Sequence, residues 1–240
     1  MIKYTLSTAA LALLAGLSMG SANAALISAN ASVGGAPTGV TLDNLDAIAL
    51  GAGGGTSATG IIISFTGDGG AVTGNLTGIY AAPVLSGGNG VGFGNPSGDQ
   101  ASGPDLTHYL TAGGTSVASA TLILPIDVKY FGLLWGSVDD FNSLELWNGD
   151  VLVGIVTGTD VTPDPTGAQT ADGTYYVNIT SDTIFNKVVA KSTDHAFEFD
   201  NIAYNPTDPT IPSPEPLTLS LFGAGLAGMG LVRRRRRRTA

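Results

Sequence analysis

The stretch LELWNGDVLVGIV, residues 144–156, constrains the fold of this chain more than any other. Apolar and polar side chains alternate over Leu144–Trp147, as on a strand with one buried face. Asn148 and Gly149 follow, and both residue types accept the positive φ of a tight hairpin turn. Val151–Val156 then returns as a second strand. The stretch predicts a β-hairpin, and with it a chain built from antiparallel strands.

Six further segments have strand character and are separated by Gly, Pro, Asn and Asp turns, with no long helical pattern between them. They are Gly60–Thr66, Ser119–Leu124, Tyr130–Trp135, Thr174–Ile179, Lys187–Ala190 and Ala196–Tyr204. This spacing predicts a mainly β fold, and more finely a β-sandwich of jelly-roll type. The TAGGTS stretch at 111–116 offers a boundary between two subdomains, but one sandwich over residues 25–210 with long loops is favoured.

The charge of the chain excludes one class of partner. Between residues 25 and 210, 18 Asp and Glu side chains face only Lys129, Lys187 and Lys191. Binding to DNA or RNA is driven by cationic side chains that displace counterions from phosphates, and this body has no basic face. We therefore expect no nucleic-acid partner.

The N-terminus has the pattern of an export signal. Lys3 precedes the apolar run LSTAALALLAGLSMG, and a small-x-small sequence, Ala-Asn-Ala, follows at 22–24. We expect residues 1–24 to be a signal peptide that signal peptidase removes between Ala24 and Ala25. The chain has no cysteine, so an exported body must be stable without disulfides.

The C-terminus has the pattern of a membrane anchor. Leu217–Val232 is an uncharged apolar run of 16 residues, which as a helix would be about 24 Å long, a little short of a bilayer core. It is preceded by Pro214, Glu215 and Pro216, which favour an extended and accessible backbone. A stop-transfer cluster, expected to stay on the cytoplasmic side, follows the run and consists of Arg233, Arg234, Arg235, Arg236, Arg237 and Arg238.

This ordered set, Pro-Glu-Pro, apolar span and terminal Arg cluster behind a signal peptide, closely resembles the PEP-CTERM sorting signal of bacteria that carry an exosortase. The resemblance implies that residues 211–240 are a sorting signal, read at Pro-Glu-Pro by that membrane-embedded, cysteine transpeptidase-like enzyme. It implies a precursor held transiently in the inner membrane and then a place at the cell surface or in extracellular polysaccharide. YFGLLWGSVDDFNSLELWNGD and AFEFDNIAY are in turn similar to a lectin-like β-sandwich pattern of such cargo proteins, in which the last strand ends in an Asp-Asn pair.

Four polar residues of the body are candidate ligand or calcium sites. In AFEFDNIAY the apolar residues alternate as Phe-x-Phe before Asp200-Asn201 and as Ile-x-Tyr after it, which predicts a bulge at this pair. Asp200, Asn201, Asp139 and Asp140 supply the hard oxygen ligands that calcium prefers, although no known calcium loop organises them. Hydrogen bonds to nearby backbone at Asp200-Asn201, and a solvated turn at Asp139-Asp140, are the simpler alternatives.

No catalytic constellation is evident. His108 and His195 stand in no spaced ligand motif, and each is expected at the surface or in a turn. Asp139 and Asp140 with Glu145 make a weak carboxylate pair, because adjacent residues on a strand point to opposite faces. We expect no catalytic residues and no cofactor, with calcium the one alternative.

Three functions remain open after these exclusions. The favoured one is a non-enzymatic surface or extracellular-matrix protein delivered by exosortase processing. The second is a binding module for a carbohydrate or, less favoured because the Thr residues have no fixed period, for ice. The third is a secreted glycoside hydrolase, which needs a concave acidic cleft with paired carboxylates.

Overall fold

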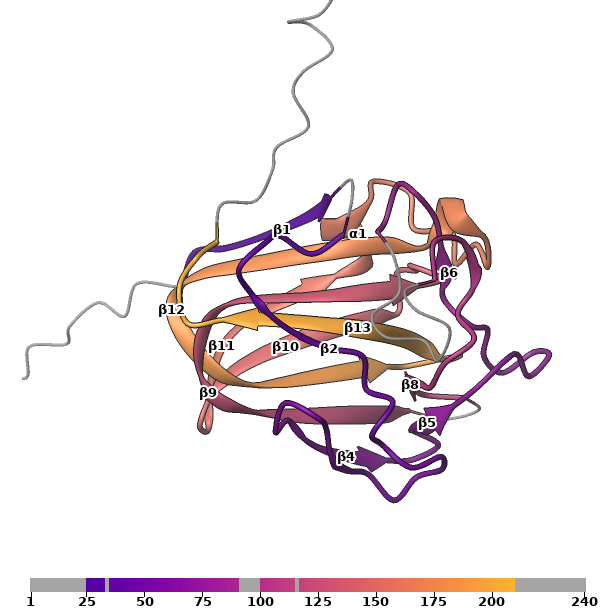
Figure 1. Ribbon diagram of the computed structural model, residues 1–240, viewed down its shortest axis with the longest axis horizontal. Coiled ribbons are helices and arrows are strands. Elements are labelled where there is room, and N and C mark those ends of the chain that lie inside the picture. Colours follow the sequence, from indigo (N-terminus) through magenta and orange to yellow (C-terminus); the bar gives the residue numbers. More distant parts are fainter. Residues whose placement is uncertain (1–24, 33–34, 91–99, 115–116, 210–240) are drawn as a thin grey trace, which may run out of the picture.

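The computed structural model describes residues 25–32, 35–90, 100–114 and 117–209 (Figure 1). Within them the chain is almost entirely strands and loops. The elements are β1 Ile27–Ser32, β2 Thr41–Asp43, β3 Gly55–Thr56, β4 Ile62–Thr66, β5 Gly70–Val72, β6 Val84–Leu85, β7 Gly103–Pro104, β8 Tyr109–Ala112, β9 Ala118–Gly136, β10 Asn142–Asn148, β11 Val151–Thr157, α1 Gly158–Val161, the 3-10 helix η1 Ala171–Gly173, β12 Tyr175–Ser192 and β13 Phe197–Asn205.

Two long strands, β9 and β12, carry the architecture. They pair antiparallel along two stretches, 118–123 of β9 with 187–192 of β12, and 130–135 of β9 with 175–180 of β12. Between the two stretches the register of the pair shifts, and β9 passes through Pro125, which has no N–H to donate to a ladder. The two strands therefore change direction together and contribute one half each to two layers.

The prediction of four separate strands in this region is wrong. β9 includes both Ser119–Leu124 and Tyr130–Trp135, and β12 includes Lys187–Ala190 together with nearly all of Thr174–Ile179. Polar and proline residues at the bends interrupt the apolar alternation, but the backbone stays extended through them. The alternation of apolar and polar residues shows which side chains are buried, not where a strand ends. At the bends the side chains are exposed, but the backbone is still a strand.

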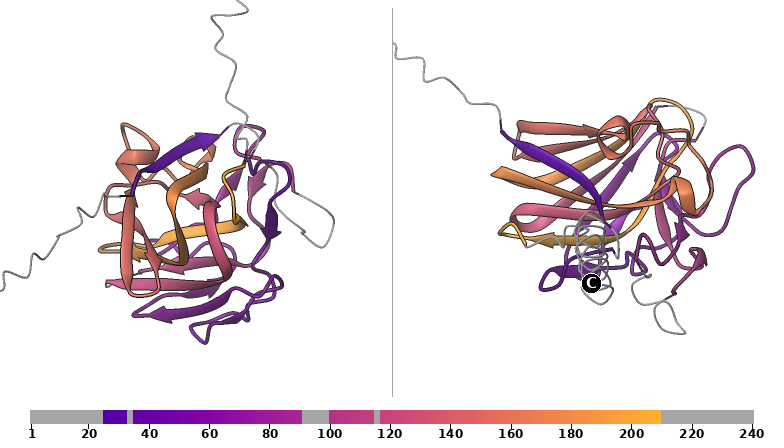
Figure 2. Two further views of the ribbon diagram at one scale, coloured as in Figure 1. Left: turned by 90° about the vertical axis from the view of Figure 1, so that its left-hand side faces the viewer. Right: turned by 90° about the horizontal axis from the view of Figure 1, so that it is seen from above.

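The strands form one large antiparallel sheet that folds over on itself (Figures 1 and 2). Layer A contains β3, β4, the first half of β9, the second half of β12, β10 and β11, in that order. Layer B contains β1, the first half of β12, the second half of β9, β13, β8 and β5, with β2 on the last part of β13. The chain is thus mainly β, as predicted, in an arrangement consistent with a β-sandwich.

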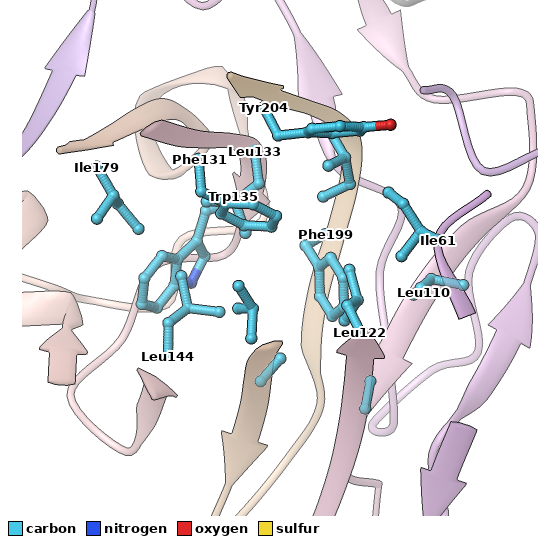
Figure 3. Close-up of a cluster of buried hydrophobic side chains, with 14 of the residues drawn as sticks. Ile61, Leu110, Leu122, Phe131, Leu133, Trp135, Leu144, Ile179, Phe199 and Tyr204 are labelled. Carbon is cyan, nitrogen blue, oxygen red and sulfur yellow. The ribbon is translucent and has the colours of Figure 1, made fainter. Parts of the chain in front are cut away.

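The main core lies between the two layers. Trp135 of β9 is fully buried and stacks on Phe197 of β13, with ring centroids 4.3 Å apart. Figure 3 shows Trp135, Leu144 and Ile179 converging on the same interior from β9, β10 and β12. Since these strands belong to both layers, their buried apolar side chains hold the folded-over sheet together.

Layer B is buried on its other face too, because loops of the early chain cover it. A second apolar cluster contains Tyr130, Leu134 and Tyr176 on that face. Gly132 of β9 makes room for it, since a Cβ at this position would run into the side chains of Tyr130 and Tyr176. The hydroxyl of Tyr130 donates a hydrogen bond to Asn178 Oδ1 at 2.7 Å, so this polar group of the cluster is paired although it is buried.

The predicted hairpin is present, with its turn one residue further along the chain. Asn148 pairs with Val151 as the last residue of β10, so the connecting residues are Gly149 and Asp150. Gly149 has a φ of +57°, and a glycine with positive φ at the first connecting position is the pattern of a type II′ turn. The Asn-Gly pair therefore marked the hairpin correctly but did not form the centre of its turn.

The bulge predicted in the last strand is confirmed. The pairing of β13 with β9 shifts register between Asp200 and Ala203, and Asn201 has a φ of +52°. Phe199 before the shift and Ile202 after it both face the main core. The extra residue therefore keeps the apolar side chains on the core side and leaves Asp200 on the opposite face of layer B.

The terminal segments were predicted from residues that lie outside those described. This holds for the signal peptide at 1–24, for Pro-Glu-Pro at 214–216, for the apolar run at 217–232 and for the Arg cluster at 233–238. In the part of the chain that the structure describes, no helix is long and apolar enough to cross a membrane.

Candidate functional site

A cavity of about 280 Å³ opens at the end of layer B where β9 leads into β10 and β13 begins. Its floor is buried and includes Ser137, Asp139 and Glu198, whereas Gln169 and His195 on its rim are exposed. Four separate segments of the chain meet here. The cavity is therefore a product of the tertiary fold, with a polar floor under an open mouth.

The structure brings two of the four predicted site residues into this cavity. Asp139 and Asp140 both line it, directly after β9. The solvated turn expected here holds for Asp140, which is exposed, but not for Asp139, which is only 5% exposed. Asp139 is buried because the chain around Thr166 bridges to it and Gly158 packs against its carbonyl.

The carboxyl of Asp139 is only partly satisfied. Its Oδ2 accepts a hydrogen bond from Asn142 Nδ2 at 3.0 Å, whereas its buried Oδ1 finds no hydrogen-bond partner among the described residues. Burial raises the pKa of Asp139 to about 7. Hydrogen bonds from nearby backbone N–H groups lower the pKa, whereas the negative charges of Asp140 and Asp194 raise it further.

Glu198, which sequence reasoning missed, is the second buried carboxyl of the cavity. Its Oε1 accepts a hydrogen bond from the backbone N–H of Ala81 at 2.8 Å, and its buried Oε2 has no partner within the described chain. Burial raises the pKa of Glu198 to about 8, with a smaller contribution from the charge of Asp139. The sequence does contain one indication of this site. Glu198 stands between Phe197 and Phe199, which places a charged side chain on the face of the strand opposite the core.

Asp200 and Asn201 lie in β13 and do not line this cavity. Asp200 is fully buried on the loop-covered face of layer B. Burial raises the pKa of Asp200 well above its ordinary value, and the nearby carboxylates of Asp105 and Asp46 raise it further. The predicted ligand residues therefore divide into a pair at the cavity and a pair inside the domain.

A further buried carboxylate, Asp43 of β2, has a structural role. Its oxygens accept hydrogen bonds from Leu45 N at 2.9 Å, from Ser57 Oγ at 2.5 Å and from the backbone and hydroxyl of Thr59 at 3.0 and 2.6 Å. Burial alone would raise the pKa of Asp43, but these hydrogen bonds outweigh it and hold the pKa below its ordinary value. Asp43 thus fastens the early loops to the sheet.

The rings of the two histidines are paired with groups other than the buried carboxyls of the cavity. His195 is exposed and its Nδ1 lies 2.9 Å from Asp194 Oδ1, while His108 Nδ1 lies 2.9 Å from the carbonyl oxygen of Ile48. Among the described residues, no group of three or more His, Cys, Asp or Glu side chains is placed to hold a metal ion. What the cavity offers chemically is a pair of buried carboxyl groups, each with one oxygen unpaired within the described chain, beneath a polar rim.

Comparisons of this chain with protein-family models, with curated proteins and with solved structures give no significant match.

Proposed function

We propose that this chain is the precursor of an exported, non-enzymatic protein of the cell surface or extracellular matrix, sorted through a PEP-CTERM-type signal. The observation that carries the proposal is the order of elements in the sequence: a small-x-small site at 22–24, Pro-Glu-Pro at 214–216, an apolar run and six arginines. Signal peptidase and an exosortase are the implied processing enzymes, and the inner membrane holds the precursor in between.

The described domain is compatible with this route. It carries nearly all the acidic residues of the chain. An acidic domain with few lysines is kept soluble by its own charge and has little attraction for anionic lipid or nucleic acid. The finer fold assignment, a jelly-roll with a signal helix before it and one transmembrane helix after it, is part of the same proposal.

No cofactor is proposed for this function. Calcium is the alternative, with Asp139 and Asp140 at the cavity, or Asp200 and Asn201 inside the domain, as separate pairs of oxygen ligands. A carbohydrate-binding module, an ice-binding module and a glycoside hydrolase are the alternative functions, and among these the polar cavity at Asp139 and Glu198 favours the first.

Replacing Pro214, Glu215 and Pro216 with Ala is expected to block loss of the C-terminal segment. If the tail is a processing signal, the extended Pro-Glu-Pro backbone is what the enzyme reads, so full-length precursor accumulates in the inner membrane. If the tail is only an anchor, the apolar run and its arginines supply all the insertion free energy, and the substitution changes nothing. A C-terminal epitope tag, followed by fractionation of a host that has an exosortase, separates these outcomes.

Pro212→Ala is the matched control, because it removes a proline from the same segment without touching the motif. This variant should lose its tag as the wild type does. Equal tag retention in wild type and in the triple variant would sink the sorting proposal.

A further inference from the structure

Two buried carboxyl groups, each with an unpaired oxygen, line one cavity although they come from distant parts of the chain. Asp139 lies between β9 and β10, Glu198 lies in β13, and each has one buried oxygen without a hydrogen-bond partner among the described residues. Leaving a buried polar atom unpaired costs about 1–3 kcal/mol, and native proteins pair more than about 90% of such atoms. Within the described part of the chain, unpaired buried atoms also occur away from this cavity, at Trp135 Nε1 and Asn178 Nδ2. The two at Asp139 and Glu198 differ because both carboxyl groups line an open cavity, where a ligand can supply their hydrogen-bond partners.

The rest of the lining matches a ligand that both donates and accepts hydrogen bonds. Ser137 offers a hydroxyl on the floor, and Gln169 and His195 offer an amide and an imidazole on the rim. Ile79 and Phe141 give the cavity an apolar side as well. A sugar ring has this same division, with hydroxyl groups around its edge and C–H groups on its face.

The size of the cavity and the charge of its lining restrict the class of ligand further. A cavity of about 280 Å³ is much larger than the space of one water molecule or ion, about 30 Å³, and lies just below the range of sites for drug-sized ligands. The described residues of the lining include the carboxyl groups of Asp139, Asp140 and Glu198 but no Lys or Arg side chain that could neutralise a negatively charged ligand. An anionic ligand such as a uronic acid is therefore disfavoured, and one neutral ring fits.

We propose that this cavity binds a single neutral sugar unit, whose hydroxyl groups, able both to donate and to accept, form hydrogen bonds with Asp139 Oδ1 and Glu198 Oε2. Because the two carboxyl groups are buried and come from separate strands and loops, such hydrogen bonds would fix the orientation of a ring. The site does not depend on the sorting signal, because all its residues belong to the described domain. Failure of the sorting experiment would leave it standing, and the converse is also true.

The test is calorimetric titration of the full chain, held in a zwitterionic detergent without a sugar headgroup. The probes are methyl glycosides of glucose, galactose and mannose, with glucuronate and calcium chloride titrated separately. At least one neutral glycoside should bind with a Kd of about 1 mM or tighter. Asp139→Ala and Glu198→Ala should each weaken it at least tenfold, because each removes a hydrogen-bonding carboxyl group from the cavity.

Two further variants keep the test decisive. Gln169→Trp places a large side chain at the exposed rim, so it should leave folding intact and abolish binding by closing the mouth of the cavity. Asp150→Asn removes an exposed carboxylate in the β10–β11 turn and should leave binding unchanged. The proposal is overturned if no neutral glycoside binds, if calcium alone binds, if glucuronate binds as well as its neutral counterpart, or if the three cavity variants bind like wild type.

Discussion

Glu198→Gln is expected to make the domain several kcal/mol more stable than the wild type at pH 9 while leaving its stability at pH 5 nearly unchanged. The pKa of Glu198 is about 8 in the folded protein because the side chain is buried and faces Asp139, whereas its ordinary value is 4.5. Between these values the folded state keeps a proton that the unfolded state releases. The free energy of unfolding therefore falls as pH rises through this window and levels off above it.

The size of the effect follows from the width of the window. Each unit of pKa difference corresponds to about 1.4 kcal/mol, so Glu198 alone accounts for a loss on the order of 4–5 kcal/mol between acid and alkaline pH. Gln cannot ionise, yet its amide oxygen can still accept the hydrogen bond from Ala81. The variant thus mimics the protonated carboxyl at every pH and avoids the penalty of a buried charge.

The measurement is urea unfolding of the full chain at pH 5, 7 and 9, with Asp150→Asn as the control for removing a negative charge. Asp150 is exposed, so its variant should keep the wild-type slope. Asp139→Asn should flatten the profile in the same direction over a narrower window, since the pKa of Asp139 is about 7. Repulsion within the acidic body lowers stability at high pH in all variants, so parallel profiles for wild type and Glu198→Gln would contradict the assignment.

Much of the fold could be predicted because it depends on local patterns. The alternation around Leu144–Trp147 and the Gly after Asn148 are local, and so is the phase change at Asp200-Asn201 that marks the bulge. What could not be predicted was that β9 and β12 each run as one continuous strand through both layers. Each layer contains half of β9 and half of β12, and this follows from ladders formed between residues about 40 to 75 positions apart, which no window of sequence contains.

The cavity shows the same limit at the level of single residues. Asp139 and Asp140 were selected from sequence as an adjacent acidic pair. That Asp139 is buried and Asp140 exposed depends on which loop covers each of them. Glu198 was not among the predicted site residues, and its alternation with Phe197 and Phe199 is also the pattern of a strand with one solvent-exposed face. Loops from the early chain cover that second face, and only the tertiary structure shows that Ala81 reaches Glu198 there.

The two tryptophans of the chain should differ sharply when each is replaced by Ala. Trp135 is fully buried between the layers against Phe197, and truncating a buried Trp to Ala costs about 3–5 kcal/mol because it removes apolar contact and leaves a cavity. Trp147 is half-buried, donates to Glu145 Oε2 at 3.0 Å and has Lys187 Nζ 5.1 Å from its ring centroid. Such partly exposed contacts contribute about 1 kcal/mol or less.

Urea unfolding at pH 5, where the wild type is expected to be most stable, measures both losses, and each variant keeps one tryptophan as its own fluorescent probe. Since a domain of this kind has a total stability of about 5–15 kcal/mol, Trp135→Ala should lose a third or more of it and Trp147→Ala only a small part. Trp135→Phe retains most of the apolar volume and should fall between them. Equal losses at the two positions would mean that the two layers are not held together through the core around Trp135, and that the sheet is stabilised mainly by its edges and loops.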